Sequence, residues 1–126
     1  MSEVPDPEAI LVAALRAQPT VTAWVSTRIA TRLGAIFPAV RVRLVSGAGR
    51  PVINTGRPQL QWESWADDEA TAARVAQAID GVSDSLSGTY TAGKIISSWV
   101  VGQYFHSDDL ATTRTRYIGQ IGLITQ

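Results

Sequence analysis

The chain has 126 residues, in which eleven Lys and Arg balance eleven Asp and Glu, and it contains no cysteine. This length suits one domain over residues 1–126, and the balanced charge argues against a protein that binds nucleic acid or membrane surfaces electrostatically. Disulfides and thiolate metal sites are excluded. No stretch approaches the ~20 apolar residues that span a bilayer, and the acidic N-terminus lacks a secretory signal, so we expect no membrane partner.

The N-terminal part is predicted to hold two helices. The tripeptide Asp6-Pro7-Glu8 has the order of a cap, a first-turn proline and a first-turn acid, so a helix is expected over Pro7–Ala17. Pro19 ends that helix. Thr20 is then placed to cap a second, short helix, in which Val21, Trp24 and Val25 have helical spacing. The segment that follows, with Arg28 and Arg32, is compatible with either a helix or a strand.

Four later segments show the alternation of apolar and polar residues that is typical of half-buried strands. Val40 and Val42 alternate with arginines, and Leu60 and Trp62 alternate with Gln and Glu. The four predicted strands are Pro38–Leu44, Pro58–Trp65, Ile95–Phe105 and Arg114–Thr125.

A helix is expected between the second and third strands, and the chain is organised around it. Asp67 or Asp68 can cap its start. Apolar residues then recur at three- and four-residue steps and form one stripe. The stripe consists of Ala72, Val75, Ala76, Ile79, Val82 and Leu86. Because it stays in phase past Gly81, the helix is predicted over Asp68–Ser87, with Gly88 as its stop.

The order of these elements predicts the fold class. Two helices are followed by two strands, a helix and two more strands. Such an order favours an α+β fold of one domain, with an antiparallel sheet of about four strands and helices packed on one face.

Two segments invite a chemical interpretation. Gly88–Lys94 matches most of a phosphate-binding loop, but Ile95 stands where that loop has a hydroxyl, and the order of helix and strand is reversed. His106 is the only histidine, and His106–Asp109 is predicted to be a solvated hairpin turn rather than a triad or a metal site. We therefore expect no catalytic residues, no cofactor and no metal. A small hydrolase or ligand-binding domain that uses this turn is the alternative from another class.

Trp62 and Trp65 are three residues apart on one predicted strand, so their side chains point to opposite faces of the sheet. One of them is therefore expected to lie outside the core. Trp65 follows at the strand's end, beside the helix cap, and is predicted at an edge of the sheet, where an exposed aromatic can anchor a partner. The predicted subunit or partner contacts are Trp65, Asp67, Asp68, His106, Ser107, Asp108 and Asp109.

The loop Ser46–Arg57 is long and rich in glycine, which is typical of functional or mobile loops in small domains. It is predicted to be mobile in the free subunit and ordered on assembly. The residues assigned to this assembly loop are Gly47, Gly49, Arg50, Asn54, Gly56 and Arg57.

Four arginines lie on two predicted strands, at positions 41, 43, 114 and 116. They can form a basic stripe that meets phosphate or an acidic partner. A plain solvated sheet face is the more common arrangement for such residues.

Taken together, the layout resembles the phage tail terminator, or tail completion, proteins of long-tailed phages. The resemblance covers nearly the full length. It comprises an N-terminal helix such as Pro7–Ala17, a Pro-led strand such as Pro38–Leu44, an aromatic and acidic run over Leu60–Asp67, an alanine-rich helix over Glu69–Ile79 and two long closing strands.

This resemblance implies a structural function without catalytic residues. Its members form rings, usually hexameric, that cap the tail tube and join it to the neck. The implied partners are further copies of the chain, the tail tube protein and a head–tail stopper or neck protein, and the genome DNA passes through the bore without specific binding. The implied location is the tail–neck junction of the virion, after assembly in the bacterial cytoplasm. A head–tail stopper or another neck ring protein is the nearest alternative.

Overall fold

The computed structural model describes residues 6–46, 57–107 and 114–126, which hold three helices and seven strands. The helices are α1 (Pro7–Arg16), α2 (Pro19–Val25) and α3 (Glu69–Val82). The strands are β1 (Ile29–Ala30), β2 (Ala39–Ser46), β3 (Gln59–Ala66), β4 (Gly88–Tyr90), β5 (Gly93–Val100), β6 (Phe105–His106) and β7 (Thr115–Thr125).

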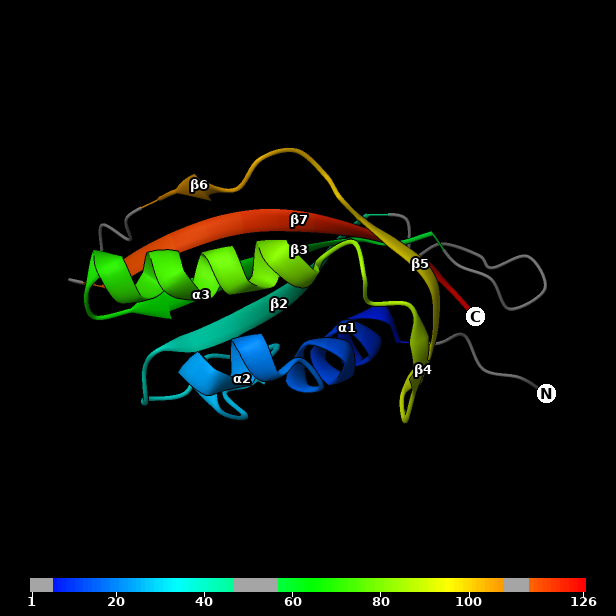
Figure 1. The fold of residues 1–126 in the computed structure, drawn as a ribbon, viewed down its shortest axis with the longest axis horizontal. Helices are drawn as coiled ribbons and strands as arrows, with labels where there is room; N and C mark the ends of the chain where they lie inside the picture. Colours follow the sequence, from blue (N-terminus) through cyan, green and yellow to red (C-terminus); the bar gives the residue numbers. More distant parts are fainter. Residues whose placement is uncertain (1–5, 47–56, 108–113) are drawn as a thin grey trace.

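The strands form one sheet in the order β1-β2-β3-β7-β5-β4, and β6 also pairs with β7. β1 runs parallel to β2, and the other pairings are antiparallel. In Figure 1, α3 lies along β3 and β7 and α1 lies beside β2, while α2 packs against α1 and α3. The predicted α+β class is therefore confirmed.

The core lies between the helices and one face of the sheet, which we call the inner face. Every buried strand residue of the core belongs to this face, and the opposite face, the outer face, carries no helix of the described residues. The core strand residues are Ile29, Val40, Val42, Leu60, Trp62, Ile95, Ile121 and Leu123.

The expected number of about four strands is too low. The four predicted strands correspond to β2, β3, β5 and β7, but the third ends at Val100 instead of continuing to Phe105. β1, β4 and β6 were missed, because segments of two or three residues are too short to show a period.

The capping predictions were right for two helices and wrong for one. Asp6 accepts a hydrogen bond from the Glu8 N–H at 3.0 Å, and Asp68 accepts one from the Thr71 N–H at 3.0 Å. Thr20 caps nothing: α2 begins at Pro19, with no side-chain cap.

The helix α3 ends at Val82, five residues before the predicted end. Ser83 lies in the next turn, and its hydroxyl donates to the Ile79 carbonyl at 2.6 Å. Such local side-chain bonds compete with helix continuation. Leu86 still reaches the core from the turn that follows, and Gly88 opens β4 rather than capping the helix.

The unprotected edge of a sheet can pair with other chains, and the fold covers one such edge with a side chain. β1 pairs with β2 at Val40 and Arg41 only. Further along β2, the Leu44 N–H donates to the Glu8 carboxylate of α1 at 2.8 Å. The backbone donor at this edge is therefore occupied.

Two glycines of β7 each lie beneath an indole ring, and they provide a matched test of packing. A Cβ at Gly119 would overlap the ring of Trp62, which is buried, while a Cβ at Gly122 would overlap the ring of Trp99, which is 37% exposed. Gly119→Ala should cost about 1–3 kcal/mol because a rigid core ring cannot move away. Gly122→Ala should cost less, since Trp99 can shift into solvent.

Urea unfolding of the two variants measures this difference. Equal unfolding midpoints for the two alanine variants would show that both rings yield alike, which contradicts the packing described for Trp62 and Trp99.

Candidate contact surface

The outer face has a polar centre that strand pairing assembles. Side chains alternate between faces along a strand, so Glu63 and Trp65 of β3 both point to the outer face. Arg41 of β2 lies directly opposite Glu63, and Arg116 of β7 lies opposite Trp65. Three neighbouring strands thus bring a carboxylate, two guanidinium groups and an indole together.

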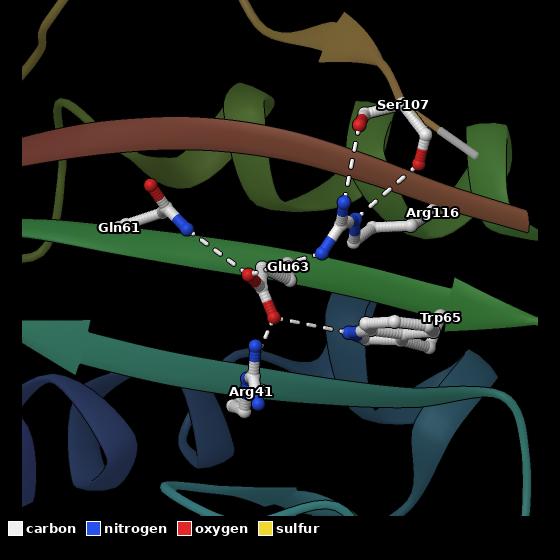
Figure 2. A network of polar contacts seen from close by, with 6 residues as sticks. All are labelled: Arg41, Gln61, Glu63, Trp65, Ser107 and Arg116. Carbon is white, nitrogen blue, oxygen red and sulfur yellow. Dashed lines mark hydrogen bonds and ion pairs between the residues drawn. The ribbon is translucent and has the colours of Figure 1, made fainter. Parts of the chain in front are cut away.

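Glu63 is the hub of this cluster (Figure 2). One carboxylate oxygen accepts hydrogen bonds from Arg41 Nε at 2.6 Å and from Trp65 Nε1 at 3.1 Å. The other accepts from Gln61 Nε2 at 3.0 Å and lies 3.7 Å from Arg116 Nη1. We call these five residues the Glu63 cluster.

The charges of the cluster keep Glu63 ionised. Burial raises the pKa of Glu63, but hydrogen bonds from Arg41 and Trp65 and the positive charges of Arg41 and Arg116 outweigh burial, so the pKa lies below its ordinary value. With two guanidinium groups around one carboxylate, the cluster carries a net positive charge.

Arg116 also connects the sheet to the segment that follows β6. Its Nε donates to the Ser107 carbonyl at 3.3 Å, and its Nη2 donates to the Ser107 hydroxyl at 3.1 Å. Its guanidinium carbon lies 5.1 Å from the centre of the Trp65 ring, within the range of a cation–π contact.

Trp65 is therefore not the exposed edge residue that the sequence predicted. Only 6% of it is exposed, because β3 is an interior strand and the Glu63 cluster covers the ring. Trp62 lies on the inner face, as its parity required, and is part of the core. Neither tryptophan presents an open anchor in the subunit.

Four other predicted contacts lie near the start of α3. Asp67 is exposed and lies 3.2 Å from Arg114 Nε, and Asp68 caps the helix. His106 stacks on Tyr117, with ring centres 5.0 Å apart, and its Nδ1 lies 3.8 Å from the Glu69 carboxylate; Ser107 follows it.

His106 was predicted in a turn, but it belongs to β6 and pairs with β7. Of the predicted assembly loop, Arg57 is described and exposed. The other predicted contacts lie outside the described residues: Gly47, Gly49, Arg50, Asn54, Gly56, Asp108 and Asp109.

Sequence reasoning placed Arg41 and Arg116 in a possible basic stripe but missed their shared partner. Both turn toward the buried carboxylate of Glu63, whereas Arg43 is exposed. The cluster follows from the register of β2 and β3, which places Arg41 directly opposite Glu63.

The exposed apolar side chains are most frequent on the strands that pair with β7 on the side away from β3. Four of the seven exposed large apolar residues in the described part of the chain belong to β5 or β6. These four are Ile96, Trp99, Val100 and Phe105. Trp99 and Val100 are successive residues of β5 and point to opposite faces, so these side chains do not form one patch.

Evidence for a ligand site is weaker. A cavity of about 260 Å³ lies beside β1, lined by Arg28, Arg32, Ile36 and smaller apolar residues, and it is smaller than the roughly 300–1,000 Å³ of typical ligand pockets. The described residues contain no group of three or more potential metal ligands. Gly88–Lys94 forms the β4–β5 hairpin rather than a phosphate-binding loop.

No helix among the described residues has the length and apolar character needed to cross a membrane.

Comparison with known proteins establishes the fold. A chain in the structure of the "Virion of native gene transfer agent (GTA) particle" superposes with a TM-score of 0.70 at 14% identity, over 94% of this chain and 93% of that chain. No protein-family model matches the sequence. No curated protein matches it either.

Proposed function

We propose that this protein is a structural component of a phage-like particle, and that it acts as a tail terminator. The observation that carries the proposal is the fold shared, over nearly the whole of both chains, with a chain of a gene transfer agent virion. The layout of the sequence, which resembles the tail terminators, supports the same assignment.

In this proposal, the protein forms a hexameric ring that caps the tail tube below and meets a head–tail stopper or neck protein above. A closed ring needs two unlike patches on each subunit, because one patch meets a different patch of the neighbour. The described surface offers unlike patches. Carboxylates cluster at the start of α3, and exposed apolar side chains lie on β5 and β6.

We further propose that Asp67, Asp68, His106 and Ser107 lie at subunit or partner contacts, as predicted from the sequence. Asp108, Asp109 and the assembly loop belong to the same proposal. Genome DNA would pass through the bore of the ring without specific binding.

The first test is the size of the particle. Size exclusion with light scattering, followed by electron microscopy, should show rings with a central bore, and these rings should cap the tail tubes of the same particle. A protein that stays monomeric at all concentrations, and also in the presence of tubes, contradicts the proposal. Binding to head-completion proteins without binding to tubes would favour the stopper.

The second test concerns the contact residues. Because Trp65 is buried, Trp65→Ala should lower the melting temperature. A lower ring yield of this variant could then result from lost stability alone, so it does not test the contact. Asp67→Arg is the sharper variant, because Asp67 is exposed and surface ion pairs contribute little to stability. It should reduce the ring yield at an unchanged melting temperature.

Asp84→Arg is the matched control, as Asp84 is an exposed carboxylate beyond the other end of α3. Equal ring yields for the two variants would remove the start of α3 from the proposed contacts.

A further inference from the structure

The cavity beside β1 combines apolar walls with two positive charges. Its volume is about 260 Å³, and the residues that line it all belong to the described segment from 28 to 40, which holds β1 and the start of β2. We call it the β1 pocket. Its lining includes Arg28, Ala30, Arg32 and Ile36.

Arg28 is held in place at its backbone and at one side-chain nitrogen. Its N–H donates to the Val25 carbonyl, and its carbonyl accepts from the Val40 N–H, both at 2.9 Å. Its Nε donates to the Pro38 carbonyl at 2.8 Å. The two terminal nitrogens of the guanidinium group form no hydrogen bond or ion pair with a described residue. The fold therefore fixes this guanidinium group at the β1 pocket and leaves its terminal donors available.

Arg32 is exposed and, like Arg28, forms no ion pair with a carboxylate of the described residues. The end of β3 that pairs with the start of β2 carries two carboxylates, Glu63 and Asp67. Both are already engaged by other arginines of the sheet. Within the part of the chain that the structure describes, the positive charge at the β1 pocket is therefore not neutralised.

The surrounding stretch of sequence adds charge of the same sign. Between Ala9 and Trp62 there is no Asp or Glu, and arginine occupies positions 16, 28, 32, 41, 43, 50 and 57. The balanced total charge of the chain conceals this segregation. A partner that binds at the β1 pocket would therefore gain from negative charge.

The volume of the β1 pocket limits what it can hold. Typical ligand pockets measure roughly 300–1,000 Å³, whereas a cavity of roughly 150 Å³ holds benzene. The β1 pocket thus has room for one ring or one branched aliphatic group, which is the size of a single large apolar side chain. Ile36 belongs to its lining and is 66% exposed, so it offers apolar surface for that side chain to cover.

We propose that the β1 pocket binds an acidic segment of a different protein, in which one large apolar side chain has Asp or Glu within two positions on either side. The apolar side chain fills the pocket and covers Ile36. The flanking carboxylates accept charge-assisted hydrogen bonds from the guanidinium groups of Arg28 and Arg32. The inference does not depend on the proposed ring.

Two other occupants fit less well. In the described residues, none of the seven exposed large apolar residues has Asp or Glu within two positions, so a second copy of this chain does not offer the required pair. A free small molecule of typical size would leave most of its surface in water. A protein segment instead gains further contacts outside the pocket.

The test uses three acetylated and amidated pentapeptides with glycine at both ends. Phenylalanine stands between two glutamates in the first peptide and between two lysines in the second, and alanine stands between two glutamates in the third. Binding is followed by NMR on the full-length protein at about 0.15 M salt, where charges more than roughly 8 Å apart are largely screened.

The first peptide should shift the amide signals of Ala30 and Ile36, and it should bind at least about tenfold more tightly than either of the others. Absence of these shifts overturns the proposal. Equal binding of the first peptide and either of the others also overturns it, because the anchor and the charge are then not both recognised.

Two variants test the pocket itself. Arg32→Glu should leave the melting temperature unchanged, because Arg32 is exposed, and it should reverse the order of the first two peptides. An unchanged order overturns the proposal. Ala30→Leu enlarges a side chain of the lining and should weaken binding of the first peptide. If that variant does not fold, Arg32→Glu remains the readout.

Arg43→Glu is the matched control, because Arg43 is an exposed arginine of β2 that does not line the β1 pocket. It should bind the first peptide as the wild type does, and equal weakening by Arg32→Glu and Arg43→Glu overturns the proposal. Shifts at Ala30 and Ile36 that appear with rising protein concentration alone would identify a second copy as the occupant and overturn it. Binding of free 3-phenylpropionate as tight as that of the first peptide would identify a small-molecule site and overturn it as well.

Discussion

Replacing Glu63 with alanine should destabilise the protein by about 2–4 kcal/mol. Removing one partner of a buried ion pair typically costs roughly 3–5 kcal/mol, because the remaining charge is left uncompensated. The expected loss is somewhat smaller here because the side chains of Arg41 and Arg116 keep 26% and 22% of their exposure and can be partly hydrated. Glu63 itself is 2% exposed.

Urea unfolding measures this loss, and Arg43→Ala is the matched control. Arg43 lies on the same face of β2 as Arg41 and is exposed, so its truncation should change the free energy of unfolding by no more than about 0.5 kcal/mol. If Glu63→Ala and Arg43→Ala unfold alike, the Glu63 cluster does not stabilise the sheet.

Lowering the pH should also remove the stabilisation that the Glu63 carboxylate provides. The pKa of Glu63 in the fold lies below its ordinary value of 4.5, so its ionised form stabilises the protein above that pH. This stabilisation is lost as the pH falls through the folded pKa. The difference in unfolding free energy between wild type and Glu63→Gln should therefore be constant near neutral pH and shrink below about pH 4.5. A difference that does not change with pH would contradict the assigned ionisation.

Val75→Asp should prevent folding. Val75 is fully buried in the apolar stripe of α3, which packs on the inner face of the sheet. An unpaired buried charge costs several kcal/mol, which is comparable with the roughly 5–15 kcal/mol that stabilise a typical domain.

Circular dichroism and thermal unfolding check this expectation, and Gln77→Asp is the control because Gln77 is an exposed residue of the same helix. That variant should melt close to the wild type. Normal cooperative unfolding of Val75→Asp would mean that α3 does not contribute this stripe to the core.

Periodicity in the sequence identified the elements that carry the core. The stripe of α3 and the alternation along β2, β3 and β7 each extend over at least eight residues, long enough for a period to be read. The end of α3 was misjudged because Leu86 keeps the helical phase while belonging to a turn that also packs on the core.

The candidate surface was harder to predict, since it depends on which strands are neighbours. The sequence shows Glu63 and Trp65 two residues apart but not that β2 and β7 flank them, and this arrangement buries both. Likewise, the pairing of β6 with β7 sets His106 near the start of α3, although about forty residues separate them in the chain. Whether these residues form contacts between subunits stays a prediction.

The hydrogen bond from the Leu44 N–H to Glu8 limits how far sheets of this protein can extend. Because this bond occupies the Leu44 N–H, the β2 edge does not offer that donor to a strand of another molecule. Removing the Glu8 carboxylate would free this donor, and a strand of another molecule could then pair with β2. Such edge-to-edge pairing is a route to aggregation, and one carboxylate in the first turn of α1 opposes it.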